Sequence, residues 1–304
     1  MSDNFKRAIP LGFAFLWSTG FVGAKYMLPH AEPFTILAIR FSLAAIVLTV
    51  IAVAIKAPVK MSKGQLVRSA YISIFLHFFY TGGVFVAVAH GVTAGIAAVF
   101  VSLQPVLVAL IAIPVLGEKL RASQLVGLGM GLIGVVLLLS PKIFEGQVAP
   151  VYTAFGIAAA VASLIGSVWG TIEQKRLGSD IPVLSGMAFQ FAVSAVMLWA
   201  LAATTETMHV DWNLQVILVL AWITLALSIG SIFLLFYMLR QGTASTVSSL
   251  LYLGTPMTAI EAYFLLGEHI PPVGLIGMAI AVTGVWLVLR QSNAGRALTN
   301  PVVN

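Results

Sequence analysis

The chain lacks cysteine altogether and has few charged residues. None of its 304 residues is cysteine, and only 9% are charged. The first absence excludes disulfides, thiolate nucleophiles and cysteine-type metal sites. The second sets the chain apart from an ordinary soluble domain, in which about 25% of residues are charged. Because 60% of the residues are hydrophobic, the composition predicts a polytopic membrane protein.

Several motifs are absent as well. The sequence holds no phosphate-binding P-loop, so ATP is not expected to drive the protein directly. It has no H-E-x-x-H, no G-x-S-x-G and no paired carboxylates within one apolar run, which argues against a membrane-embedded hydrolase or metalloprotease. The net charge of +6 comes from Lys and Arg scattered singly, which form no basic stripe. We therefore expect no catalytic residue, metal, cofactor or nucleic acid.

Long apolar runs dominate what is present. A helix needs about 20 mostly apolar residues to cross the hydrocarbon core, and only helices or closed barrels satisfy their backbone in lipid. The predicted fold class is all-α, with ten transmembrane helices. They lie near residues 9–28, 33–55, 67–89, 92–114, 122–140, 152–172, 183–204, 212–239, 244–266 and 271–289. The first run follows a short basic region, as in a signal peptide, but no small-residue cleavage site precedes Lys25, so it stays the first helix.

The stretch from 91 to 139 recurs at 242 to 289, which indicates an internal duplication. Matches at a spacing of 151 or 150 residues are Gly91 with Gly242, Pro105 with Pro256, Gly117-Glu118 with Gly267-Glu268, Gly20 with Gly170, Lys25 with Lys175, and Ile39-Arg40-Phe41 with Phe189-Gln190-Phe191. The chain is therefore predicted to hold two repeats of five helices, at 1–145 and 146–292. A cytoplasmic tail at 293–304 follows, and the polar residues after Arg290 are expected to be disordered.

Positive charge predicts the orientation. Thirteen Lys and Arg residues fall on the side that holds the N-terminus, and only Lys142 falls in the loops of the other side. Cytoplasmic loops carry the excess of positive charge, so both termini are predicted to be cytoplasmic. An odd number of helices per repeat makes the second repeat enter the membrane from the opposite side. The two repeats are therefore inverted, which is a recurring plan of transporters.

This layout resembles the drug/metabolite transporter superfamily, of the EamA type, over essentially the whole chain. The resemblance is carried by the duplication and by three motifs: the run 16–20 (Leu-Trp-Ser-Thr-Gly), Arg40 in the second helix, and a Gly-Glu pair that ends the fourth and ninth helices. The second repeat departs from the pattern at Gln190, which stands where Arg40 would recur. Any charge role of that position is thus confined to the first half.

Polar and aromatic side chains near the middle of the helices are candidates for a substrate-binding site. Polar groups within a span are costly, so they are expected to face the bundle interior or water. Aromatic walls with a few neutral hydrogen-bonding groups suit an amphipathic solute. The predicted substrate-binding residues are Trp17, Ser18, His77, Tyr80, Gln104, Tyr252 and Thr255. The alternatives are packing between helices for each aromatic residue, and for His77 a neutral ring bonded to a helix carbonyl rather than a proton-coupling role.

Prolines, glutamates and small residues mark the helices of both repeats. Pro105 and Pro256 are predicted to kink two helices that line or gate a site, with a static kink as the alternative. Glu118 and Glu268 are expected to fix loop geometry rather than touch substrate. Small residues in the fifth and tenth helices are spaced for close packing, against each other or a second copy. They are Gly127, Gly131, Gly134, Gly277, Ala281 and Gly284.

Two charged residues lie at matching depths from the outer face. Arg40 and Glu261 both sit roughly 8–11 Å deep, counted at 1.5 Å per residue. A lone charge at such depth favours pairing or a water-filled vestibule. The hypothesis is that the two form an ion pair that helps to close the outer side, with Lys25 as a competing partner for Glu261. The alternative is that Arg40 snorkels outward or bonds helix carbonyls.

The leading functional prediction is a secondary transporter that works by alternating access. The resemblance implies export of small metabolites across the inner membrane, with aromatic or other apolar amino acids as the cargo class. A facilitative channel and a carrier of another solute class, such as nucleobases or drug-like compounds, are the alternatives. The expected partners are a small-molecule substrate and membrane lipid, and the expected state is a monomer or weak homodimer.

Overall fold

The computed structural model describes residues 3–90, 92, 94–144, 153–266 and 272–299, and these are almost entirely helical. The elements are α1 (Asp3–Met27), α2 (Pro33–Ala54), α3 (Lys63–Ser73), η1 (Ile74–Gly82), α4 (Gly83–Ala89), α5 (Ala94–Leu116), α6 (Ala122–Phe144), α7 (Ala154–Leu177), α8 (Val183–Thr205), α9 (Leu214–Trp222), η2 (Ile223–Ser231), α10 (Ile232–Gln241), α11 (Ala244–Ser249), α12 (Leu251–Leu266) and α13 (Pro272–Thr299). The elements η1 and η2 are π-helices.

The length of the helices and their apolar surface indicate that this fold is surrounded by lipid. Within the described residues, six helical segments are long and apolar enough to cross a membrane, and three shorter apolar segments accompany them. Large apolar side chains point outward, such as Phe264, which is 77% exposed, and Val196, which is 68% exposed. So much exposed apolar surface suits lipid rather than water. The protein is a polytopic membrane protein.

Both π-helices stand at the middle of a longer segment and were not predicted. In the first half, α3, η1 and α4 follow one another without a gap from Lys63 to Ala89, and in the second half α9, η2 and α10 do so from Leu214 to Gln241. Each π-helix is nine residues long. Such wide turns are rare and occur frequently at functional sites. Their apolar sequences look like ordinary α-helix, so composition carried no signal of them.

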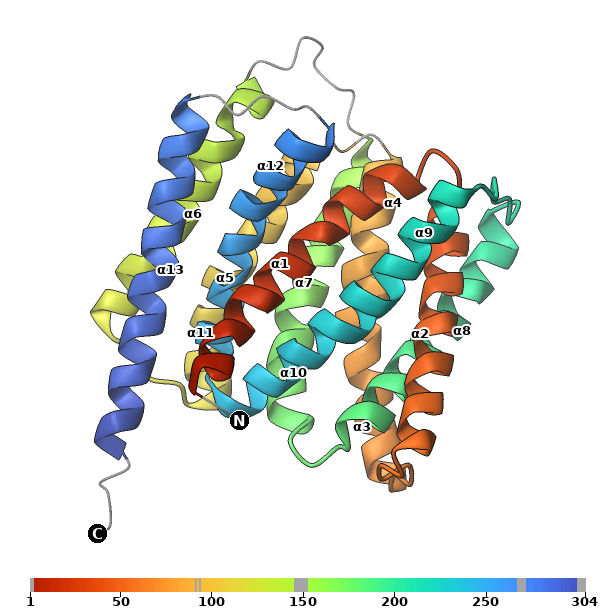
Figure 1. Ribbon diagram of the computed structural model, residues 1–304, viewed down its shortest axis with the longest axis horizontal. Coiled ribbons are helices and arrows are strands. Elements are labelled where there is room, and N and C mark those ends of the chain that lie inside the picture. The colour runs from red at the N-terminus through yellow and green to blue at the C-terminus, as the bar shows by residue number, and fades with distance from the viewer. Residues whose placement is uncertain (1–2, 91, 93, 145–152, 267–271, 300–304) are drawn as a thin grey trace.

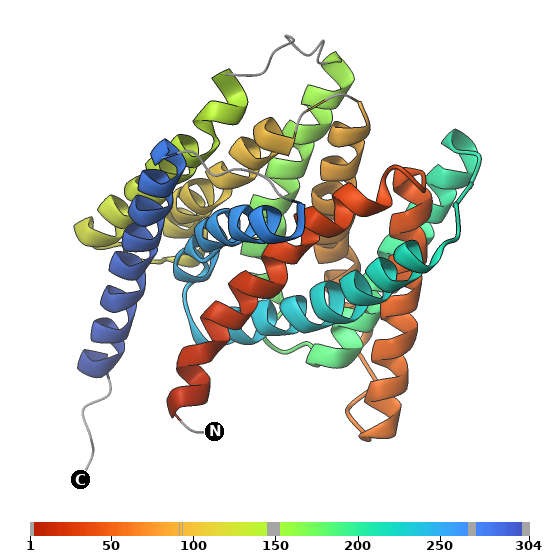
Figure 2. The same ribbon diagram turned by 45° about the horizontal axis from the view of Figure 1, so that its top comes forward.

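Helices of the two halves contact one another reciprocally. In Figure 1, α6 lies along α13 at one side of the molecule and α2 lies along α8 at the other. Between these pairs, α1 packs on η2 and α12, while α7 packs on η1 and α5. Figure 2 shows α1 crossing the molecule beside α12 and the α9–η2–α10 segment. Each of these contacts thus has a counterpart in which the two halves exchange places.

Glycines join α6 to α13 with their backbones nearly touching. A Cβ added to Gly134 would lie 2.5 Å from the carbonyl oxygen of Gly277, and one added to Gly284 would lie 2.5 Å from that of Gly127. Real Cβ atoms do not come so close to backbone, so only glycine fits at these points. The predicted close packing of the small residues is confirmed, and α6 and α13 pack against each other.

Glutamate side chains cap helices of the opposite half. Glu206, after α8, accepts hydrogen bonds from the Phe34 and Thr35 amides at the start of α2, each 2.7 Å long. Glu118 accepts from the Ala244 amide at 2.5 Å and from the Ser245 hydroxyl at 2.5 Å. A carboxylate satisfies the free N–H groups of a helix start and complements its dipole. The loop role predicted for Glu118 is confirmed.

The second glutamate of that prediction, Glu268, lies outside the described residues. The polar tail departs from its prediction, because α13 continues to Thr299. The expectation of disorder after Arg290 is therefore wrong as far as residue 299. Ala, Arg and Leu in this stretch favour helix, and the first proline beyond it is Pro301. Since the residue before a proline avoids the α conformation, sequence alone allows the helix to run this far.

Candidate functional site

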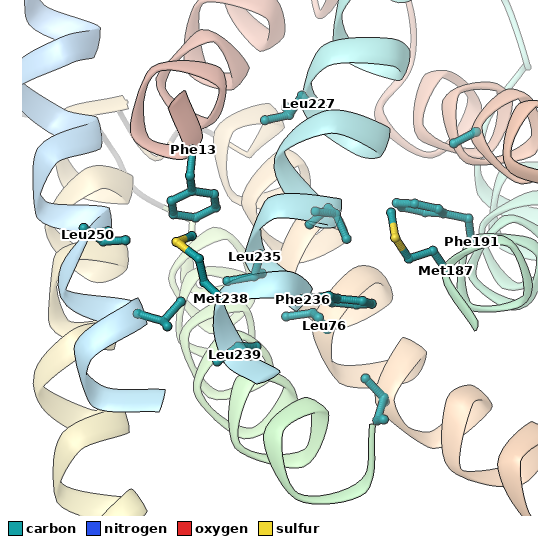
Figure 3. Close-up of a cluster of buried hydrophobic side chains, with 14 of the residues drawn as sticks. Phe13, Leu76, Met187, Phe191, Leu227, Leu235, Phe236, Met238, Leu239 and Leu250 are labelled. Atoms are coloured by element: carbon teal, nitrogen blue, oxygen red, sulfur yellow. The ribbon is translucent and has the colours of Figure 1, made fainter. Parts of the chain in front are cut away.

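A cavity lies in the middle of the bundle, between the two halves. Its volume is about 90 Å³. Figure 3 shows Leu76 of η1, Leu227 of η2 and Phe191 of α8 among the buried hydrophobic side chains, and all three also line the cavity. The lining residues are Trp17, Gly20, Arg40, Phe41, Leu76, His77, Tyr80, Thr81, Val84, Phe85, Phe191, Leu227, Ser228 and Ile232. Ten of them come from the first half and four from the second.

Arg40 supplies the charge in this lining. The side chain is 6% exposed, and its Nε donates a hydrogen bond of 2.7 Å to the Ser228 hydroxyl on η2. Its guanidinium carbon lies 5.5 Å from the ring centroid of Phe41. Within the described residues Nη1 and Nη2 donate no hydrogen bond, and no carboxylate forms an ion pair with Arg40. A buried cation thus borders the cavity with donors to spare.

A chain of neutral polar side chains stands behind the cavity wall. Gln190 Nε2 donates to Gln174 Oε1 at 3.1 Å, which leaves Gln190 Oε1 to accept from His77 Nε2 at 3.2 Å. This order places the proton of a neutral His77 ring on Nε2. The His77 ring packs 4.5 Å from that of Phe191, between centroids. Its partner is therefore a side-chain amide of the other half rather than the helix carbonyl considered for it.

Aromatic rings form another part of the wall. Trp17 and Tyr80 stack with ring centroids 6.1 Å apart and an interplanar angle of 14°. Phe41 and Phe191, which occupy equivalent positions in the two repeats, lie 5.1 Å apart. Such rings offer a flat apolar surface together with the hydroxyl of Tyr80. The cavity therefore suits a solute with an apolar body and a small polar or charged end.

The structure brings together Trp17, His77 and Tyr80 among the predicted substrate-binding residues, but separates them from the others. Ser18 points to α12, where its hydroxyl lies 2.5 Å from Glu261 Oε1. Gln104 Nε2 donates to the Thr171 hydroxyl on α7 at 3.3 Å. Neither residue lines the cavity.

The two predicted residues on α12 also lie away from the cavity. Tyr252 is 1% exposed, its ring lies against Gly131 of α6, and its hydroxyl has no partner among the described residues. Thr255 is half-buried and does not line the cavity. Counting residues along the helix gave a depth for Tyr252 and Thr255, and that depth suggested a shared site. It could not give the direction in which each side chain points around its helix.

The predicted ion pair between Arg40 and Glu261 is not formed in this structure. Arg40 bonds Ser228, whereas Glu261 accepts from Ser18 and keeps a second oxygen without a partner in the described part of the chain. The two residues share a depth, but α2 packs on η2 and α12 packs on α1, so their neighbours differ. The side chain of Lys25, the competing partner, lies outside what the structure describes.

Both predicted kinks fall within helices. Pro105 lies inside α5 and Pro256 inside α12. In the second half the helix is divided near this point, because α11 ends at Ser249 and α12 starts at Leu251. Pro256 removes the hydrogen bond to the carbonyl of residue 252, so the division at residue 250 lies before the turn that the proline affects. A gating role of either proline stays a prediction.

The lining residues that sequence reasoning did not assign to the site include Phe41 and Phe191, and Ser228 was not predicted as the partner of Arg40. Arg40-Phe41 and Gln190-Phe191 recur at a spacing of 150, so one polar-aromatic pair stands at the same place in both repeats. That repetition was the available signal for a shared wall. The partner of Arg40 carried no comparable signal, since a serine in an apolar helix is common.

A helical membrane fold with a central cavity lined by side chains of both halves, five of them Phe, Tyr or Trp, is the arrangement expected of a membrane transporter. The comparison with known families agrees. Residues 9–140 and 154–290 match the EamA-like transporter family, so the chain belongs to that family and is a membrane transporter. The family consists of transporters rather than enzymes.

Relatives of known sequence are similar over most of their length. An uncharacterized transporter, YvbV, of Bacillus subtilis is 25% identical over 96% of this chain and 94% of its own. An uncharacterized inner membrane transporter, YedA, of Escherichia coli K12 is 25% identical over 94% of this chain and 92% of its own. A probable terminal-alkyne amino-acid exporter of Streptantibioticus cattleyicolor is 25% identical over 66% of each chain. A solved crystal structure with 19% identity shares the fold, with a TM-score of 0.78 over 94% of this chain and 97% of that one.

Proposed function

We propose that the protein is a secondary transporter that exports small amphipathic metabolites, with apolar and aromatic amino acids as the cargo class. One observation carries this proposal: the cavity is lined by residues of both halves, among them Trp17 and Tyr80 of the first and Phe191 of the second. A site shared between two halves changes its access when the halves rock against each other. The similarity to a named amino-acid exporter supports the cargo class.

We further propose that the ten helical segments cross the inner membrane as two inverted repeats. The reciprocal contacts support inversion, because α1 meets η2 as α7 meets η1. The start of α1 and the end of α13 lie at the same end of the bundle in Figure 1, as a cytoplasmic location of both termini requires. Similar halves related in this way give inward-open and outward-open states of similar energy.

Counterflow in proteoliposomes tests the proposal. Vesicles loaded with unlabelled L-phenylalanine should take up external labelled L-phenylalanine faster than empty vesicles, with saturation. A channel would show neither trans-acceleration nor saturation. Absence of uptake for every apolar amino acid tried, in vesicles that hold folded protein, would refute the proposed cargo.

Variants connect that transport to the cavity. Trp17→Ala and Tyr80→Ala should each lower uptake about tenfold or more, since each removes an aromatic wall worth about 1.5 kcal/mol or more. Tyr252→Phe is the matched control, because that hydroxyl has no partner in the described chain and lies away from the cavity. Uptake at the wild-type rate by both alanine variants would place the substrate elsewhere.

A further inference from the structure

The cavity contains an excess of positive charge that nothing in its lining compensates. Arg40 is 6% exposed and borders the cavity, and no Asp or Glu is among the described lining residues. A charge buried within a membrane protein favours a partner of opposite charge, because water is not there to solvate it. Among the described lining residues, Ser228 accepts a hydrogen bond from Arg40, and its hydroxyl engages only Nε.

The geometry of the Arg40 guanidinium leaves its two terminal nitrogens available as donors. Arginine presents five N–H donors in a plane, and its two terminal nitrogens match the two oxygens of a carboxylate. The bond from Nε to Ser228 and the contact with the Phe41 ring hold the plane in place. The donors on Nη1 and Nη2 are then available to a group that enters the cavity. A carboxylate would bring both the missing charge and the matching acceptors.

The other end of an amino acid finds no such counterpart. An ammonium group needs acceptors, and a buried one needs a negative charge nearby. The cavity offers only neutral acceptors for it, such as the hydroxyls of Tyr80 and Thr81. Glu261, the carboxylate of α12, lies outside the lining, and its Oε1 accepts a hydrogen bond from Ser18. The cavity therefore has a place for the acidic end of the solute and none for the basic end.

We propose that Arg40 is the carboxylate subsite of this transporter, and that the cavity selects organic carboxylates with an apolar or aromatic body without reading an amino group. The body would lie against Trp17, Tyr80 and Phe85, which line the same cavity. This inference rests on the proposed function for its substrate size and deepens it. Amino acids enter through their carboxylate, and the corresponding acids that lack nitrogen are accepted as well.

Binding to the purified full chain in detergent tests the subsite without transport. Three probes share a phenyl ring and differ in their charged end: 3-phenylpropionate has only the carboxylate, L-phenylalanine has both groups, and 2-phenylethylamine has only the ammonium. Affinities follow from the rise of the melting temperature with probe concentration. The two carboxylates should bind within about threefold of each other, and the amine about tenfold or more weaker, because a hydrogen bond to a charged group is worth that much.

Variants assign the effect to Arg40. Arg40→Gln places the residue of the second repeat at this position and should weaken 3-phenylpropionate binding about tenfold or more. Arg40→Lys keeps the charge but not the fork, and should fall between the wild type and Arg40→Gln. Arg68→Gln is the matched control, since Arg68 is on α3 outside the cavity. If Arg40→Gln does not fold, Arg40→Lys carries the test.

Three results would overturn the subsite: no binding of either carboxylate to the wild type, equal binding of the amine, or unchanged 3-phenylpropionate affinity in the folded Arg40 variant. These results are distinct from failure of the proposed function. Counterflow of L-phenylalanine that persists unchanged in Arg40→Gln would refute the subsite and leave transport standing. Carboxylate binding that depends on Arg40, in protein that shows no counterflow, would refute transport and leave the subsite standing.

Discussion

The two halves make the same crossed contact with different side chains. Arg40 of α2 reaches Ser228 of η2, and Gln190 of α8 reaches His77 of η1. Arg40 and Gln190 are 150 residues apart, and His77 and Ser228 are 151 apart, as are other equivalent positions. The first crossing holds a cation at the cavity, whereas the second is a neutral amide and imidazole pair. The duplicated backbone thus builds the architecture, and the side chains that differ give the cavity its charge.

The largest effect is expected where both halves contribute backbone. Gly134→Ala on α6 would place a Cβ 2.5 Å from the Gly277 carbonyl of α13. Forced separation of these helices should destabilise the protein by about 3 kcal/mol. Gly129→Ala on the same helix is the control, since its Cβ would meet nothing within 4 Å. Thermal unfolding in detergent measures both, and equal melting temperatures would mean that the two helices do not meet as described.

The next largest effect on stability is expected at a pair of equivalent glycines, Gly20 and Gly170. A Cβ on Gly170 would lie 2.7 Å from the backbone nitrogen of Leu76, whereas one on Gly20 would meet only the Leu227 side chain, at 2.7 Å. Backbone cannot yield, but a leucine can change rotamer. Gly170→Ala should therefore destabilise by about 1–3 kcal/mol and Gly20→Ala by less than about 1 kcal/mol. The same unfolding assay checks the order, and a reversed order would contradict the packing.

Removal of the hydrogen bond between Gln190 and His77 should have a moderate effect on stability. Gln190→Leu takes the hydrogen-bond partner from His77 and from Gln174 at once, which should destabilise the protein by about 1–3 kcal/mol. His77→Gln keeps a donor for Gln190 and should retain L-phenylalanine counterflow. Complete loss of substrate accumulation in His77→Gln, with exchange preserved, would instead make His77 a proton-coupling residue.

The smallest effect is expected at the loop between α7 and α8, outside the membrane segments. Arg68 bonds Asp180 at 2.7 Å and holds the pKa of that carboxyl below its ordinary value. A lowered pKa in the folded state stabilises the fold above the unfolded pKa, about 4. This contribution is lost as the pH falls through the lower, folded pKa. Asp180→Asn should therefore leave uptake at pH 7 unchanged, lower the stability slightly above about pH 4, and match the wild type in more acidic solution, where neither protein has the contribution. Reduced uptake at pH 7 would reveal a role in gating.

Sequence predicted the parts of this fold that follow from composition and repetition. Apolar runs indicated the helices, and small residues at fixed spacing indicated the contact of α6 with α13. The depth of a residue along its helix can also be predicted from sequence, and depth was the basis for placing Trp17, His77 and Tyr80 in one site. The direction of a side chain around its helix cannot be predicted, because a few uncertain residues at a helix end change it by a large angle. Tyr252 and Glu261 were misplaced for that reason, and the π-helices turned other residues by an amount no pattern revealed.

The two π-helices also bear on how such a bundle can rearrange. A π-turn holds more residues than an α-turn, so it is a local irregularity within a longer helix. A shift of the π-turn by one residue along the chain would rotate the side chain at that point by about 100°. The flanking helices, α3 and α4 or α9 and α10, would keep their contacts with neighbouring helices. His77 and Tyr80 lie in η1 and Ser228 in η2. The rings and hydroxyls around the cavity could thus be exchanged by a local backbone slip, with no movement of the helix ends.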